Sequence, residues 1–165
     1  MNKRSVMFFD IDGTLLTHEK ELPASTKRAI LNLKEQGHEV VIATGRAPFM
    51  FGDLRKELDI HTFVSYNGQY VVLNGEVLYT NPLNIPSLEK LTETALYNQH
   101  PVVFMDHEDM KANVPEHTYI KESIATLKIG RFPMHDPHYC KGRQLYQTLL
   151  FCPEGKRNNM NRNFK

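Results

Sequence analysis

The segment Val6-Met7-Phe8-Phe9-Asp10-Ile11-Asp12-Gly13-Thr14-Leu15-Leu16 decides the fold that we expect for this chain. It begins with an apolar run, which is typical of a strand buried on both faces of a sheet. Two carboxylates, Asp10 and Asp12, then follow one residue apart. A buried acid is costly without a polar partner, and like charges resist joint ionisation. The pattern therefore favours a hard cation such as Mg2+, bound together with a phosphate group.

Gly13 and Thr14 follow the acidic pair and help to decide between two interpretations of it. Gly13 permits a backbone turn that a side chain would hinder, so the amides after Asp10 could point at an anion. The alternative is a strand followed by an acidic surface turn, which a lone Asp-x-Asp would favour. The preceding strand, the Gly-Thr pair and the nearly N-terminal position together favour the ligand site.

A second strand is predicted beside the first. Pro23 introduces a helix that Ser25 or Thr26 can cap, and Gly37 is a natural left-handed stop. Residues 39–43 then form another short apolar run. This order predicts a right-handed βαβ unit with parallel strands, whose carboxyl ends share one edge of the sheet. Ligands bind outside that edge in such sheets.

Thr44, Gly45 and Arg46 follow the second strand, so we expect them to lie beside the two aspartates. Thr44 can donate a hydrogen bond to a phosphoryl oxygen, Gly45 lets the backbone approach it, and Arg46 offers a planar fork suited to phosphate. The next helix, opened by Pro48, would present its N-terminus to the same anion. The alternative is a helix cap followed by a surface arginine, which this tripeptide alone would favour.

The string Asp-x-Asp-Gly-Thr-Leu at residues 10–15 resembles the first motif of the haloacid dehalogenase-like (HAD) phosphatase superfamily. Thr-Gly-Arg at residues 44–46 resembles the second motif of its Cof-type branch. The resemblance implies an α/β fold with a Rossmann-like parallel-sheet core. It also implies that Asp10 is the nucleophile, that Asp12 is the general acid and base, and that Thr44 holds the phosphoryl group. Mg2+ would bind the Asp10 carboxylate and the Asp12 backbone carbonyl.

The third strand is predicted at residues 62–65, and residues 69–80 are predicted to form a β-hairpin. Asn67 lies between them. In Cof-type proteins an Asn-Gly at this place lies near the substrate entrance, which would make Asn67 a substrate-binding residue. Asn-Gly is also a strong turn signal by itself, and both interpretations stay open.

The remaining residues predict a second region of different character. Residues 83–155 mix helices and strands and resemble part of the α+β cap of the Cof-type (C2) branch. Within them, residues 106–109 form an acidic cluster that we interpret as a solvated turn rather than a metal site. We therefore expect the N-terminal half of a HAD core in residues 1–82, a partial cap in residues 83–155, and an aberrant polar tail in residues 156–165.

The superfamily also has a third motif, a lysine, and a fourth, an acidic pair, and neither is recognised in this chain. Lys141-Gly142 is rejected because it lies among the predicted cap residues. We therefore expect a shortened phosphatase with weak or no activity. A non-catalytic remnant and a phosphomutase-like phosphotransferase are the competing interpretations. We also expect an uncovered sheet edge, which favours self-association.

The composition of the chain limits the classes of partner that we expect. The chain has 165 residues, is 41% hydrophobic and 24% charged, and has a formal net charge of +1. Such a balance gives no electrostatic reason to expect nucleic acid or an anionic membrane as partner, and no stretch is long enough to span a bilayer. Cys140 and Cys152 have no Cys-x-x-Cys spacing and are expected to be reduced, buried thiols. We therefore expect a cytoplasmic protein whose partner is a small phosphorylated metabolite, such as a sugar phosphate.

Overall fold

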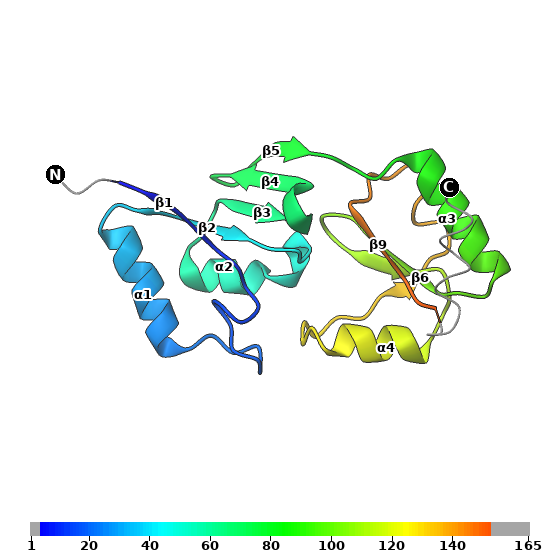
Figure 1. Cartoon of the computed structure of the whole chain (residues 1–165), viewed down its shortest axis with the longest axis horizontal. Coiled ribbons are helices and arrows are strands. Elements are labelled where there is room, and N and C mark those ends of the chain that lie inside the picture. The colour runs from blue at the N-terminus through cyan, green and yellow to red at the C-terminus, as the bar shows by residue number, and fades with distance from the viewer. Residues whose placement is uncertain (1–3, 153–165) are drawn as a thin grey trace. The chain divides into compact units, whose positions relative to one another are not determined.

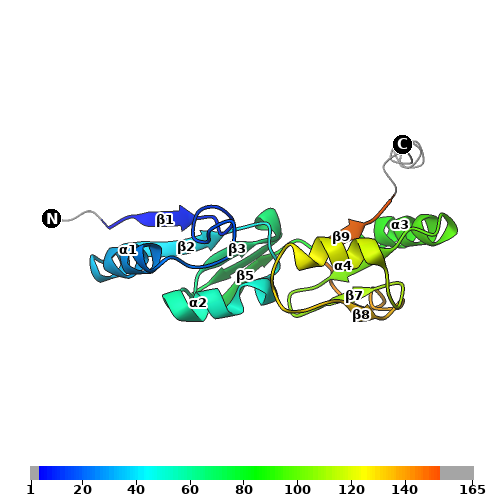
Figure 2. The same ribbon diagram turned by 90° about the horizontal axis from the view of Figure 1, so that it is seen from below.

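The computed structural model describes residues 4–152 and divides the chain into two compact units. Among the described residues, the first unit comprises residues 4–82 and 127–129, and the second comprises residues 83–126 and 130–152. The two units are seen from two directions in Figures 1 and 2. The polar tail that the sequence predicts at residues 156–165 lies outside the described residues.

The first unit is built on a five-stranded sheet in the order β1-β2-β3-β4-β5. The first three strands are parallel, and the last two add as antiparallel neighbours. Their bounds are β1 Val6–Phe9, β2 Glu39–Ala43, β3 Phe63–Ser65, β4 Tyr70–Leu73 and β5 Glu76–Thr80. The predicted α/β fold with a parallel sheet is thereby confirmed. The Asn74-Gly75 turn between β4 and β5 has φ angles of 51° and 86°, which these two residue types tolerate.

Two helices accompany the parallel strands. Helix α1 (Ala24–Glu35) joins β1 to β2, and Gly37 ends it with φ +84°. The predicted cap is wrong, because Pro23 occupies the N-cap position and, in the described chain, no side chain caps this helix. Helix α2 (Gly52–Leu58) precedes β3. The two helices lie side by side (Figure 1) and are joined by an ion pair between Lys27 Nζ and Glu57 Oε1 at 3.0 Å.

Strand β1 differs from its prediction, because it is not buried on both faces. Val6 is 59% exposed and Phe8 is 62% exposed, and β1 has β2 as its one neighbour in the described sheet. Apolar side chains of this segment are buried in the core only after the strand ends. Ile11 and Leu15, in the loop that follows β1, are 0% and 1% exposed.

The second unit contains a separate four-stranded sheet in the order β8-β7-β6-β9. The bounds of its elements are α3 Ile85–Tyr97, β6 Val102–Met105, β7 Met110–Ala112, α4 Thr118–Ala125, β8 Met134–His135 and β9 Gln147–Leu150. Leu88, Ala95, Phe104 and Leu145 form its core. Both helices and strands are therefore found in this region, as the sequence predicts.

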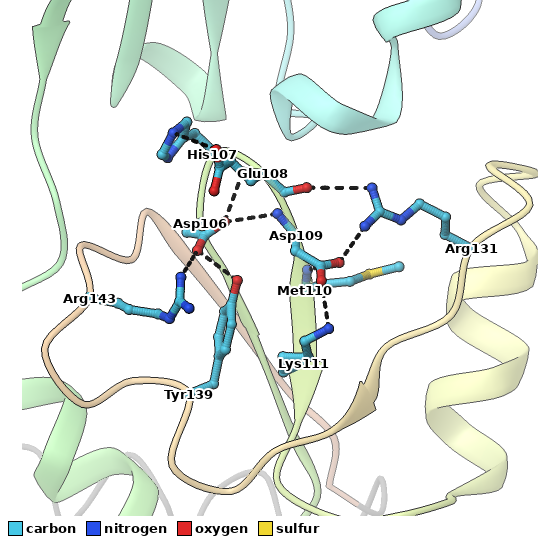
Figure 3. Close-up of polar contacts among 9 residues, drawn as sticks. All are labelled: Asp106, His107, Glu108, Asp109, Met110, Lys111, Arg131, Tyr139 and Arg143. Carbon is cyan, nitrogen blue, oxygen red and sulfur yellow. Dashed lines mark hydrogen bonds and ion pairs between the residues drawn. The ribbon is translucent and has the colours of Figure 1, made fainter.

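The turn between β6 and β7 is more ordered than the solvated acidic turn that the sequence predicts. Asp106 is only 3% exposed and accepts hydrogen bonds from the Glu108 and Asp109 amides, both at 2.8 Å. Its Oδ2 atom also accepts from the Tyr139 hydroxyl at 2.6 Å, as Figure 3 shows. Arg143 contacts the same oxygen at 3.3 Å. Asp106 thus fastens the turn to the loop that carries Tyr139.

Candidate active site

The two predicted catalytic carboxylates lie in the loop after β1. The loop is closed by hydrogen bonds from the Leu15 amide to the Asp10 carbonyl at 3.3 Å and from the Leu16 amide to the Ile11 carbonyl at 2.9 Å. Ile11 and Leu15 point into the core, and Asp10 and Asp12 are exposed. Gly13 has φ +78°, which glycine adopts without strain. Two buried apolar residues therefore anchor the loop and leave its carboxylates facing solvent.

The carboxylate of Asp12 is bound to Arg46, which follows β2. Arg46 Nε lies 2.9 Å from Asp12 Oδ2, and Arg46 Nη2 lies 2.7 Å from Asp12 Oδ1. The Arg46 side chain is 7% exposed, so it is held in this bidentate geometry by its surroundings. The two predicted motifs therefore meet at one edge of the sheet. Arg46 contacts a carboxylate here, and its predicted contact with phosphate stays a prediction.

Lys20 is a second cation on Asp12, and the sequence does not predict it. Its Nζ atom lies 2.6 Å from Asp12 Oδ1. The pKa of Asp12 is lowered from 3.8 to about 2. The main cause is the hydrogen bond from Arg46, and Lys20 makes a smaller contribution. No local pattern marks Lys20, because its contact depends on how the loop folds back on itself.

Thr44 and Gly45 occupy the place predicted for them, at the carboxyl end of β2. Phe9 pairs with Ile42, so Asp10 and Thr44 follow the ends of neighbouring parallel strands. Thr44 is 6% exposed, and its Oγ1 atom accepts a hydrogen bond from the Arg46 amide at 3.2 Å. Because it acts as an acceptor there, the hydroxyl keeps its own hydrogen for donation.

Asn67, after β3, reaches the same edge. Its amide donates to the Thr44 carbonyl at 3.1 Å. Its side chain lies against Gly45, where an added Cβ would be 3.1 Å from Asn67 Oδ1 and 3.3 Å from Asn67 Nδ2. The Ser65 hydroxyl donates to the Arg46 carbonyl at 2.5 Å. The ends of three neighbouring strands are therefore joined, and a side chain at position 45 would press on the Asn67 amide.

Two details of the predicted anion site are different in the structure. The amides of Gly13 and Thr14 donate to carbonyls of their own loop, at 3.0 and 3.4 Å. Pro48 begins a single 3-10 turn, η1 (Pro48–Met50), and the short helix α2 begins only at Gly52. An α-helix therefore does not start directly after Arg46 as expected. Anion binding by Gly13 and Thr14 stays a prediction.

The oxygen atoms near Asp10 fit a hard cation. Within residues 4–152, the Asp10 carboxylate has no hydrogen-bond or ion-pair partner, and the Asp12 carbonyl accepts no hydrogen bond. The Asp12 carboxylate, in contrast, is occupied by Arg46 and Lys20. In the described part of the chain there is no cluster of three or more His, Cys, Asp or Glu side chains for a metal ion. The donors that are present suit Mg2+, which keeps several waters and takes one or two carboxylates with a phosphate.

The sequence matches the profile of one known family, described as haloacid dehalogenase-like hydrolase, over residues 7–165. The chain belongs to this family. A Bacillus subtilis protein, "Putative phosphatase YkrA", is 44% identical over 149 residues, which are 90% of this chain and 58% of that protein. The Escherichia coli pyridoxal phosphate phosphatase YbhA is 30% identical over 115 residues, which are 68% of this chain and 41% of that protein.

Solved structures show the same fold for this HAD-like hydrolase. A protein from Geobacillus kaustophilus is 50% identical with a TM-score of 0.91, over 99% of this chain and 63% of that one. The HAD subclass IIB sugar phosphatase BT4131 has a TM-score of 0.77 at 22% identity, over 98% of this chain and 63% of that one, which supports the fold alone. The chain thus spans about three fifths of the length of YkrA and of these two solved proteins, and less of YbhA. Within residues 4–152, no helix has the length and apolar character that a bilayer crossing requires.

Proposed function

We propose that this HAD-like hydrolase is a Mg2+-dependent phosphate-monoester hydrolase that acts on a small phosphorylated metabolite, such as a sugar phosphate. The observation that carries this proposal is the bidentate contact between Arg46 and Asp12, because it unites the two motif loops at the ligand-binding edge of a parallel sheet. The name of YbhA extends the range of substrates worth testing to pyridoxal phosphate.

In the proposed reaction, Asp10 is the nucleophile because its carboxylate is exposed and has no partner in the described chain. An Asp10 oxygen attacks phosphorus, the bond from phosphorus to the leaving oxygen breaks, and a proton from Asp12 neutralises that oxygen. Water then attacks the aspartyl-phosphate, Asp12 accepts its proton, and inorganic phosphate leaves Asp10 free. Two easier steps replace one difficult transfer. When bound by Asp10 and the Asp12 carbonyl, Mg2+ would neutralise phosphoryl charge.

The cations around Asp12 favour its carboxylate form, as the lowered pKa shows. That form is the base needed to activate water in the second step. The first step needs the protonated form. We infer that the phosphoryl oxygens of the substrate draw Arg46 and Lys20 toward themselves, which releases Asp12 to take up a proton.

Release of inorganic phosphate from a panel of sugar phosphates and pyridoxal phosphate, with and without Mg2+, tests the proposal. We expect weak, Mg2+-dependent release by the wild-type chain and none by Asp10→Asn. Glu35→Gln, which changes an exposed carboxylate on α1, is the matched control and should release phosphate as the wild type does. Release by Asp10→Asn at the wild-type rate would refute the assignment of the nucleophile.

Two further measurements separate the competing interpretations. Beryllium fluoride mimics a phosphoryl group on an aspartate, and Mg2+-dependent binding of it is expected here but not for a non-catalytic protein. A phosphomutase-like phosphotransferase would need a bisphosphate activator, whereas we expect phosphate release without one. Failure to bind beryllium fluoride would contradict the proposed hydrolase.

A further inference from the structure

Lys20 lies in a tight turn that aims its side chain at Asp12. The turn is closed by hydrogen bonds from the Thr17 amide to the Glu21 carbonyl at 2.9 Å and from the Lys20 amide to the Thr17 carbonyl at 3.0 Å. Lys20 has φ +65°, a left-handed conformation that glycine adopts more easily than lysine. Strained backbone of this kind is a reason to look for a role of the side chain. The Lys20 side chain is 22% exposed and ends 2.6 Å from Asp12 Oδ1.

The contact of Lys20 is not needed to neutralise Asp12. Arg46 already binds both carboxylate oxygens, and its Nη2 atom lies 2.7 Å from the oxygen that Lys20 contacts. One carboxylate therefore faces two cations that are largely withdrawn from water. Lys20 and Arg46, which bind Asp12, also line a cavity of about 460 Å3, and Asp10, Asp12 and Thr44 are not among its lining residues.

A count of charges shows what the extra cation can do. Asp10 and Asp12 carry two negative charges, and Arg46 and Lys20 carry two positive charges, so the four side chains sum to zero. A phosphate-monoester dianion bound with Mg2+ leaves that sum unchanged. Without Lys20 the same complex would carry one uncompensated negative charge, in a partly buried place where charges interact more strongly than in water.

We propose that Lys20 is a positioning residue of the active site, which holds the Asp12 carboxylate together with Arg46 and supplies the positive charge that balances a bound phosphoryl dianion. The proposal rests on the proposed phosphate-monoester hydrolysis. It gives a role to a residue that lies outside both motif strings, in the polar loop between the first motif and α1.

The test is calorimetric titration of orthovanadate, a phosphoryl mimic, into the chain in the presence of Mg2+. Lys20→Gln should bind at least about tenfold more weakly than the wild type, since it loses one charge-assisted contact. Lys20→Arg keeps the charge and should stay within about threefold of the wild type. Lys27→Gln is the matched control, because Lys27 pairs with Glu57 instead, and should bind as the wild type does. Wild-type affinity should also fall more steeply with added salt than Lys20→Gln affinity does.

Thermal melting of each variant shows whether it is folded, and the salt dependence separates a role of the charge from loss of packing. Equal affinity of Lys20→Gln and wild type would overturn the inference, as would equal weakening by Lys20→Arg and Lys20→Gln. Phosphate release that does not depend on Lys20 would leave the proposed hydrolase standing and remove this inference. Lys20-dependent vanadate binding by a chain that releases no phosphate would support the role of Lys20 and contradict the proposed hydrolase. Absence of vanadate binding by the wild type would overturn both.

Discussion

At the scale of single residues, Gly45 is where the site has least room. A methyl group there would press on the Asn67 amide at 3.1–3.3 Å, and Asn67 is exposed and free to turn away. We therefore expect Gly45→Ala to cost under about 1 kcal/mol of unfolding free energy while lowering kcat/KM about tenfold through displacement of Asn67. Urea unfolding and phosphate release measure the two effects.

The control for Gly45 is Gly52, at the start of α2, where an added Cβ meets nothing within 4 Å. Gly52→Ala should lower kcat/KM far less than Gly45→Ala does, and its unfolding free energy should be equal to that of the wild type or higher. If Gly45→Ala behaves like Gly52→Ala in both measurements, the close contact with Asn67 has no functional meaning.

The lowered pKa of Asp12 predicts how the stability of the chain changes as the pH falls. Its pKa in the folded chain, about 2, lies below the ordinary 3.8, so its carboxylate form is bound more tightly in the folded state. The stability that this contributes is present above about pH 3.8 and is lost as the pH falls toward 2. Asp12→Asn should therefore be less stable than wild type at pH 6, and the difference should shrink between pH 4 and pH 2.5. Urea unfolding at each pH tests this, and a constant difference would contradict it.

At the scale of elements, the Tyr139 hydroxyl is one of several groups that hold the β6–β7 turn through Asp106. Burial alone would raise the pKa of Asp106, but hydrogen bonds from Tyr139 and from the Glu108 and Asp109 amides outweigh it and lower the pKa. Tyr139→Phe removes the 2.6 Å bond to a carboxylate that is 5% exposed, at a cost of about 2 kcal/mol of unfolding free energy. Tyr97→Phe, at an 89% exposed position, should change nothing. Equal effects in urea unfolding would show that the buried bond contributes no stability.

The strands of the two sheets show how much of the fold the sequence could predict. Strands β2 and β3 follow from short apolar runs, and the β4–β5 hairpin follows from Asn74-Gly75 between two such runs. Strands β7 and β8 have three and two residues, too few for an alternating pattern to appear. Burial of Asp106 could not be predicted either, because its partners Tyr139 and Arg143 are 33 and 37 residues away.

The candidate site, like the fold, could be predicted from the sequence only in part. Its motif residues are found at the predicted sheet edge because parallel strands place their carboxyl ends together. The direction of Arg46 toward Asp12, and the arrival of Lys20 beside it, depend on side-chain packing and on a left-handed turn. Neither leaves a periodic signal in the sequence, so these contacts needed coordinates.

At the scale of the whole molecule, the exposed apolar surface of β1 supports the predicted self-association. Val6 and Phe8 are two residues apart on one strand, so they point to the same face of a strand that lies at the edge of the sheet within residues 4–152. We propose that this edge associates with other copies of the chain at high protein concentration. Phe8→Lys adds a charge to the edge and should lower the weight-average mass in sedimentation equilibrium. Tyr97→Lys adds the same charge to α3 in the second unit and should leave that mass unchanged. A wild-type chain that is monomeric over a hundredfold range of concentration would exclude association through β1, since an exposed apolar edge should respond to mass action.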